Sequence, residues 1–188
     1  MESAKRKQKN IVDPFSSLLI AHSFNLETAT ELDNLENSSA ALRGISNPLG
    51  KFHQTILGAI PGWSDHDAGY DLECVDKSII AEVKNKHNTM NASNRAKVIE
   101  DLETAIRQKR GNWSAYLVQI IPKSPHRDKK LVGKRVYEID GASFYALATG
   151  YDNALHELFD IFCERLSLSD SICKHCKNVM AATLPPRI

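Results

Sequence analysis

The stretch GYDLECVDKSIIAEVKNKHN, residues 69–88, decides the fold of this chain. Asp76-Lys77 reads as a tight turn between two segments whose residues alternate between faces, which predicts a β-hairpin with strands over residues 70–75 and 78–86. A turn centred on this dipeptide also sets the register of the two strands. It builds one apolar face from three cross-strand pairs, namely Cys74 with Ile79, Leu72 with Ala81 and Tyr70 with Val83.

The second face of this hairpin gathers charged side chains. The same register puts Asp71 opposite Glu82 and Glu73 opposite Ile80, with Lys84 two residues beyond Glu82. Opposed carboxylates repel, and a hard cation such as Mg²⁺ would relieve that repulsion while keeping waters or phosphate oxygens as its other ligands. Lys84 could then orient a nucleophilic water or neutralise a phosphate. A solvated face with an ordinary salt bridge also satisfies the pattern, because Glu-x-Lys alone is common.

The segments that follow the hairpin predict an α/β fold. A helix capped by Asn91 or Ser93 and ended by Gly111 leads into WSAYLVQII, residues 113–121, which is typical of a strand covered on both faces and closed by Pro122. A hairpin, a crossover helix and a buried strand in this order predict a mixed β-sheet with a parallel central strand. This context favours the metal site over the salt bridge. The other expected elements are helices at residues 14–35 (one or two), 47–60, 142–149, 153–166 and 169–180, a basic loop at 123–135 and a strand at 136–139.

Composition and charge narrow the class of protein. The chain has 188 residues, is 42% hydrophobic and has a formal net charge of +1, which allows one substantial core and argues against a polybasic protein. Four cysteines are too few for a disulfide scaffold, and the absence of a signal peptide favours a reducing cytoplasm. The longest apolar runs are far shorter than the roughly 20 residues that span a bilayer. We therefore expect a soluble protein with a flexible basic tail at residues 1–12 and one domain at residues 13–188.

The hairpin and its surroundings resemble a known group of enzymes. Asp71, Glu82 and Lys84 are similar to the signature of the PD-(D/E)-x-K nuclease superfamily, with Gly69-Tyr70-Asp71 in place of its Pro-Asp element. The segments GKFHQTILGAIPGW, AEVKNKHNTMN and AYLVQIIPK resemble type II restriction endonucleases, in particular the family that cleaves GGNCC or GGWCC sites. The resemblance covers about residues 45–125 and implies a restriction-endonuclease-like nuclease domain. In it the catalytic core spans about residues 45–140, and C-terminal helices span residues 141–182.

This resemblance also implies roles for single residues. Asp71 and Glu82 would hold Mg²⁺, together with the backbone carbonyl of Val83, and Lys84 would position the water that attacks a phosphodiester in double-stranded DNA. Gln54 stands where family members often have a further carboxylate, and its amide can hold a metal-bound water. A symmetric homodimer would match a palindromic site cut on both strands, within a restriction-modification system of a prokaryotic cytoplasm. Two aspartates before the first strand are alternative acidic ligands or ordinary turn formers: Asp65 and Asp67.

Polar and basic residues beyond the hairpin are candidates for DNA contact. One group directly follows the catalytic strand, and residues 123–135 hold six Lys or Arg against one Asp. Such side chains suit phosphates and base edges alike, and the alternative is a solvated loop. The candidates are Asn85, Lys86, His87, Asn88, Arg95, Lys123, Arg127, Lys129, Lys130, Lys134 and Arg135, with Lys97 a weaker one.

The C-terminal cysteines allow a second metal site. Cys173 and Cys176 have the spacing of half a zinc site, which Cys163 with His175 or His156 would complete. The alternative is a set of reduced, partly buried thiols.

Three functions therefore stay open at this point. The first is a magnesium-dependent type II restriction endonuclease, without a small-molecule cofactor or a membrane partner. The second is a repair or junction-resolving nuclease of the same superfamily, which would cut by DNA structure rather than sequence. The third is a DNA-binding regulator that keeps the hairpin but does no chemistry.

Overall fold

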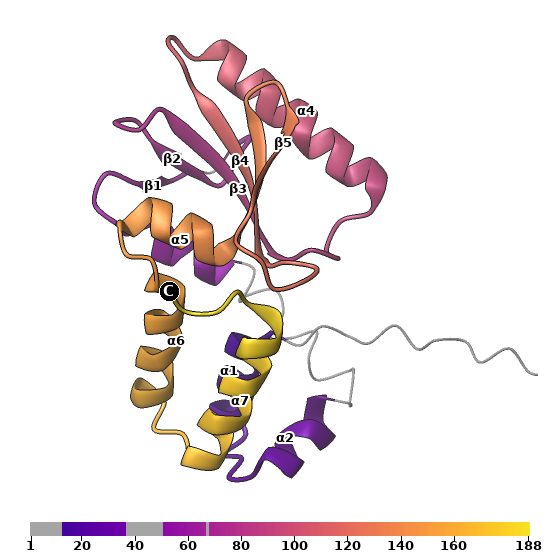
Figure 1. The fold of residues 1–188 in the computed structure, drawn as a ribbon, viewed down its shortest axis with the longest axis vertical. Coiled ribbons are helices and arrows are strands. Elements are labelled where there is room, and N and C mark those ends of the chain that lie inside the picture. The colour runs from indigo at the N-terminus through magenta and orange to yellow at the C-terminus, as the bar shows by residue number, and fades with distance from the viewer. Residues whose placement is uncertain (1–12, 37–50, 67) are drawn as a thin grey trace, which may run out of the picture.

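The computed structural model describes residues 13–36, 51–66 and 68–188 (Figure 1). Its helices are α1 (Pro14–Ser23), α2 (Ala29–Glu36), a helical segment at residues 51–58, α4 (Ala92–Gln108), α5 (Gly141–Thr149), α6 (Ala154–Arg165) and α7 (Asp170–Thr183). Its strands are β1 (Ser64–Asp65), β2 (Leu72–Cys74), β3 (Ile79–Lys86), β4 (Ser114–Ile121), β5 (Lys129–Gly133) and β6 (Val136–Asp140). The helix expected from residue 47 is present from residue 51, and its expected start lies outside the described residues. None of the described helices is long and apolar enough to cross a membrane.

The six strands form one mixed sheet in the order β1-β2-β3-β4-β6-β5. β3, β4 and β6 run parallel, whereas β1 and β2 are antiparallel to their neighbours, as is β5 at the other edge. β4 lies inside the sheet and is buried after Ser114, as its apolar sequence predicts. The predicted α/β class is thus confirmed, with its antiparallel hairpin, crossover helix and parallel central strand.

The hairpin has the predicted register for as long as β2 lasts. Leu72 pairs with Ala81 and Cys74 with Ile79, on either side of a turn that Ser78 closes with φ 52°. The prediction for Tyr70 is wrong, because it packs with Ile80 on the opposite face of the sheet instead of pairing with Val83. The face-to-face pairing of Asp71 with Glu82 is not formed either, since β2 begins only at Leu72.

The departure has a local cause at Asp71. Its backbone N–H donates to the carbonyl of Ala81 at 2.9 Å, and its side-chain Oδ2 accepts from the backbone N–H of Val83 at 2.7 Å. The carboxylate therefore takes the position that a backbone carbonyl would occupy in a longer ladder. This ends the regular alternation of β2 one residue early and frees Tyr70 to turn toward α4.

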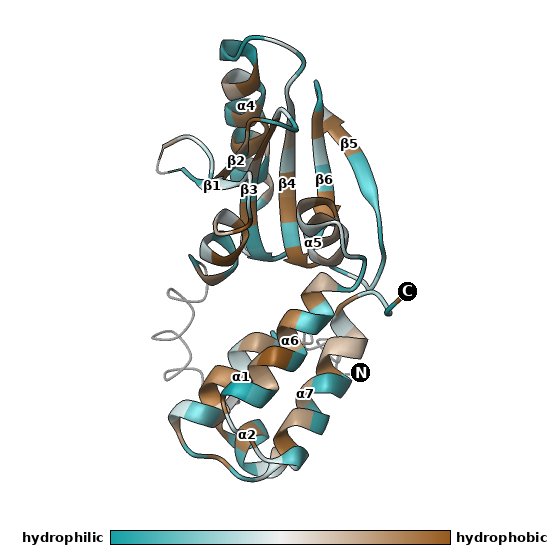
Figure 2. Ribbon diagram, turned by 90° about the vertical axis from the view of Figure 1, so that its left-hand side faces the viewer, coloured by the Kyte–Doolittle hydropathy of each residue, from teal (hydrophilic) through white to brown (hydrophobic). Residues whose placement is uncertain are grey.

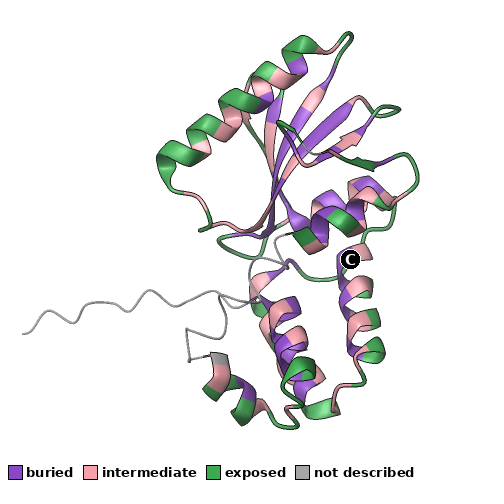
Figure 3. Cartoon of the chain, turned by 180° about the vertical axis from the view of Figure 1, so that it is seen from behind, coloured by how far each residue is buried: buried purple, intermediate pink, exposed green. Residues whose placement is uncertain are grey.

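Helices cover both faces of the sheet. α4 lies on one face, where Leu102 and Ile106 pack with Ile80 and Leu117 (Figures 1 and 3). α5 lies on the other face, and α1, α2, α6 and α7 form a bundle beside it that shares its apolar core (Figure 2). The caps agree with the sequence: Asn91 caps α4, Ser169 caps α7, and Gly150 ends α5 in the left-handed conformation at φ 81°.

The basic segment at residues 123–135 is only partly a loop. It contains the edge strand β5, which pairs antiparallel with β6 and shifts register between Leu131 and Gly133. Lys129 and Lys130 are exposed on this edge, where charge discourages pairing with another chain. The charge run that suggested a loop is thus in part the edge of the sheet.

Candidate active site

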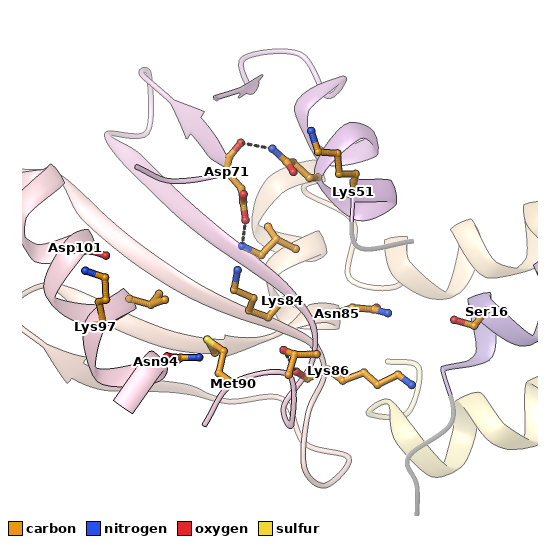
Figure 4. A pocket seen from close by; sticks show the side chains of 14 residues that line it. Ser16, Lys51, Asp71, Lys84, Asn85, Lys86, Met90, Asn94, Lys97 and Asp101 are labelled. Atoms are coloured by element: carbon orange, nitrogen blue, oxygen red, sulfur yellow. Dashed lines mark hydrogen bonds between the residues drawn. The ribbon is translucent and has the colours of Figure 1, made fainter. Parts of the chain in front are cut away.

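Asp71 is the most perturbed acid of the site. It lies just before β2, mostly buried, and is fixed by the bond from Val83 (Figure 4). Burial, followed by repulsion from Glu82, raises the pKa of its carboxyl from 3.8 to about 6, although the Val83 N–H and Lys84 oppose that rise. A carboxylate held in this way is stabilised by any cation that enters beside it.

Glu82 and Lys84 supply the other charges from β3. The two side chains lie on the same face of this strand, and Lys84 Nζ contacts Glu82 Oε1 at 2.5 Å. The Lys84 side chain is 29% exposed and the Glu82 side chain is 17% exposed, so both remain accessible to solvent and to a ligand. Figure 4 shows the Lys84 amine directed toward Asp71. The structure therefore gathers the three predicted residues, although Asp71 reaches them from a strand end and not from a paired position.

Gln54 closes the site from the helical segment at residues 51–58. Its Nε2 donates to a carboxylate oxygen of Asp65 and, at 3.4 Å, to the backbone carbonyl of Asp71. Both contacts use the amide nitrogen, which leaves the amide oxygen as an acceptor. Asp65 thus contacts Gln54, and Asp67 lies outside the described residues.

A cleft of about 770 Å³ opens over these residues. Lys51, Lys84, Lys86 and Lys97 line it, so its lysines come from three elements, and Lys86 is directed away from Asp71 (Figure 4). Glu82 borders an adjoining hollow of about 300 Å³ that shares Asp71 and Asp101 with the cleft. A cleft lined by amines that meets a pair of carboxylates at its border suits a phosphate chain together with a cation.

Sequence reasoning missed several lining residues. Ser16 and Lys51 reach the cleft from α1 and from the segment at residues 51–58, far from the hairpin in sequence, and Asn94 reaches it from the first turn of α4. A usable signal existed for Lys51, which precedes Gln54 by one helical turn and so shares its helix face. Lys97, a weaker candidate in the sequence, also lines the cleft.

The residues that follow Lys84 are held in different ways. Asn85 and Lys86 line the cleft, yet the Asn85 amide donates to Asp13 Oδ2 at 2.7 Å. Burial, followed by the charge of Lys123, lowers the pKa of His87. Asn88 is exposed in the turn beyond.

The remaining basic candidates do not line the cleft. Several are engaged elsewhere: Arg95 donates to Glu138, Arg127 to the carbonyls of Asp152 and Pro186, and Arg135 to Asn112, while Lys129 lies 4.9 Å from the ring centre of Tyr137. Lys123 and Lys130 border a separate hollow, and Lys134 is exposed. DNA contact by these residues stays a prediction.

The described part of the chain contains no cluster of three or more His, Cys, Asp or Glu placed to hold a metal. All four cysteines are free thiols, and burial, followed by contact with Cys173, raises the pKa of Cys163 to about 12. His175 instead contacts Asp33 at 3.3 Å. The zinc site that the sequence left open thus gains no support among these residues. Asp71 and Glu82 fit Mg²⁺ better, because that ion binds through one or two carboxylates and keeps several waters.

Comparisons with known proteins agree with this geometry. Residues 1–168 match the family model described as Eco47II restriction endonuclease. The type II restriction enzyme Eco47II of Escherichia coli is 36% identical over 167 residues, which cover 79% of this chain and 69% of that enzyme. The type II restriction enzyme Sau96I of Staphylococcus aureus is 25% identical over 170 residues, which cover 80% of this chain and 64% of that enzyme.

Proposed function

This chain belongs to the Eco47II restriction endonuclease family and is a site-specific deoxyribonuclease, and we propose that it cuts both strands of duplex DNA with Mg²⁺ held by Asp71 and Glu82. Type II restriction enzymes generally need a divalent metal ion. The observation that carries the proposal is the pair of mutually repelling carboxylates, Asp71 and Glu82, beside the Lys84 amine, where a cleft lined by further lysines meets the adjoining hollow that Glu82 borders. Mg²⁺ is the hard, oxygen-seeking cation that suits such a pair.

The residues of the site divide the chemistry between them. A bound Mg²⁺ would lower the pKa of a coordinated water and offset the charge that develops on the phosphate. Asp71 and Glu82 would hold it, with the Val83 carbonyl as a further oxygen ligand. Coordination of a metal by Glu82 would weaken the contact between Glu82 and Lys84 and would leave the Lys84 amine available to the cleft. Lys84 could then hold the attacking water or a phosphate oxygen, and the amide oxygen of Gln54 could accept a hydrogen bond from a metal-bound water.

Duplex DNA is the substrate that the cleft supports. Lys51, Lys86 and Lys97 line the same cleft as Asp71, and their amines could contact phosphates of a duplex bound there. We further propose a homodimer, in which each subunit cuts one strand of a GGNCC or GGWCC site, because a two-fold protein matches a palindrome. The protein would act in the cytoplasm of a prokaryote as part of a restriction-modification system.

Digestion of supercoiled plasmid DNA with Mg²⁺ tests this function. The wild-type protein should give discrete bands, and Asp71→Ala and Lys84→Ala should give none, while the Lys84→Ala variant still shifts the DNA in a gel. Nicking that follows DNA branches instead of sequence would identify a repair or junction-resolving nuclease. Binding without cutting by the wild-type protein would identify a regulator. Normal cutting by Asp71→Ala would refute the site.

A further inference from the structure

Asp13 is a buried carboxylate with no place in the mechanism above. It stands at the N-terminus of α1 and is 0% exposed, although it is separated from the hairpin by more than fifty positions in the chain. Three donors converge on its side chain: the Phe15 N–H at 3.0 Å, the Ser16 hydroxyl at 3.0 Å and the Asn85 amide at 2.7 Å. The first two form an ordinary helix cap. The third leaves the helix and reaches the catalytic strand.

The residue that Asp13 holds comes directly after Lys84. The β3–β4 register pairs Lys84 with Gln119 and Lys86 with Ile121, and the Asn85 side chain between them points to the opposite face, toward α1 (Figure 4). Asp13 can only accept hydrogen bonds when ionised, so it fixes which end of the Asn85 amide faces α1. β3 is thus held by its pairing with β4 and, one residue beyond Lys84, by the hydrogen bond from Asn85 to Asp13 at the N-terminus of α1.

We propose that Asp13 is a positioning residue for Lys84. Its hydrogen bond from Asn85 holds β3 against the N-terminus of α1 and thereby fixes the position of the neighbouring Lys84. This inference rests on the proposed nuclease function. It makes α1 part of the catalytic apparatus, outside the core expected at residues 45–140. It also gives Asn85 a role in fixing the strand in place of phosphate contact, because its amide nitrogen is already engaged.

Cleavage kinetics on a plasmid with one mapped cut site test this role of Asp13. The reactions contain Mg²⁺ and are run at a temperature well below the Tm of every variant. Loss of a partner that orients a catalytic group typically costs about 10- to 100-fold in rate. We expect Asp13→Ala and Asn85→Ala each to lower kcat by about that factor with KM changed less than about threefold. The double variant should lose no more than either single one, since both remove the same bond. Asp13→Asn, which keeps an acceptor oxygen, should recover most of the rate.

Asp140 provides the matched control. It is another buried helix cap, for α5, which accepts from Ser143 and Asp128 and does not contact β3. Asp140→Ala should lower Tm while leaving kcat within about twofold of wild type. If Asp13→Ala behaves in the same way, losing Tm but not kcat, Asp13 is only a cap and the inference is wrong.

A charge exchange keeps the test decisive if the alanine variants do not fold. Asn85→Asp alone opposes two carboxylates and should lower kcat, whereas Asn85→Asp combined with Asp13→Asn restores an acid–amide bond and should recover it. A single Asn85→Asp variant that cuts at the wild-type rate would overturn the inference. Absence of cutting by the wild-type protein would instead refute the nuclease function itself, so the two failures are distinct.

Discussion

The ionised carboxylate of Asp71 should lower the stability of the folded protein when no metal is bound. Its carboxyl is mostly buried near Glu82, and its pKa is raised from 3.8 to about 6, so the folded protein favours the protonated form. The change Asp71→Asn removes the charge but keeps an oxygen that can accept from the Val83 N–H. We therefore expect this variant to be more stable than wild type in EDTA and inactive with Mg²⁺.

The size of this effect follows from the pKa. A rise from 3.8 to about 6, at about 1.4 kcal/mol per unit, limits the cost of ionised Asp71 to about 3 kcal/mol. Solvent screening at this partly open site reduces it to about 1–2 kcal/mol. For a chain of this length each kcal/mol shifts Tm by about 2–4 °C, so Asp71→Asn should melt about 2–8 °C higher at pH 8. Because the folded pKa is the higher one, the cost is complete above pH 6 and fades as pH falls toward 3.8.

Thermal melts in EDTA at pH 8 and pH 4 measure the effect. Most of the advantage of Asp71→Asn should disappear at pH 4, where the wild-type carboxyl is protonated in the folded protein and close to half protonated in the unfolded chain. Glu73→Gln is the matched control on β2: burial favours a higher pKa for Glu73, but bonds from Tyr70 and Lys109 outweigh it and lower the pKa. That variant should melt lower than wild type at pH 8. An Asp71→Asn variant that melts at or below wild type at pH 8 would refute the reasoning.

Two further predictions concern binding and acid stability. Lys51→Ala and Lys97→Ala should each weaken binding of duplex DNA several-fold, as measured by fluorescence anisotropy in Ca²⁺. Each should also reduce the slope of log K against log salt by about 0.9, because one phosphate contact is lost. An unchanged slope would show that these lysines do not contact phosphates. Burial lowers the pKa of His53 to about 3, so the unfolded chain binds one more proton below pH 6.5 and wild type should lose about 1.4 kcal/mol per pH unit there. His53→Gln, which can keep the bond to Tyr145, should lose about 2 kcal/mol less than wild type between pH 7 and pH 5 in urea unfolding, and equal losses would contradict the assignment.

Local sequence patterns predicted much of the fold. The hairpin register followed from the position of one turn, and the α4 cap and the buried β4 followed from side chains within or next to each element. The pairing of Tyr70 could not be predicted, because the hydrogen bond from the Val83 N–H to the Asp71 carboxylate replaces the ladder at that point. β5 was hidden because lysines on a sheet edge have the composition of a loop.

The sequence predicted which acidic residues lie together in the site, but it predicted fewer of the residues around them. Asp71, Glu82 and Lys84 lie within one hairpin, so the position of its turn was enough to predict that they lie close together, although Asp71 reaches the others from the end of β2 and not from a paired position. Lys51, Ser16 and the Asp13–Asn85 bond depend on how distant helices pack against β3, for which a single sequence carries no periodic signal. Arg127 is a case in which a local charge pattern was a poor guide. Its charge suggested DNA contact, but its guanidinium donates to the backbone carbonyls of Asp152 and Pro186.

The central claim is that Asp71 and Glu82 hold the ion that supports cleavage. The most direct measurement is the anomalous diffraction of Mn²⁺, in place of Mg²⁺, in crystals of the protein bound to duplex DNA. We predict a peak between the two carboxylates, in contact with a phosphate oxygen, with Lys84 turned away from Glu82. A peak bound by Asp65, or none beside Asp71 while the DNA lies in the cleft, would contradict the account.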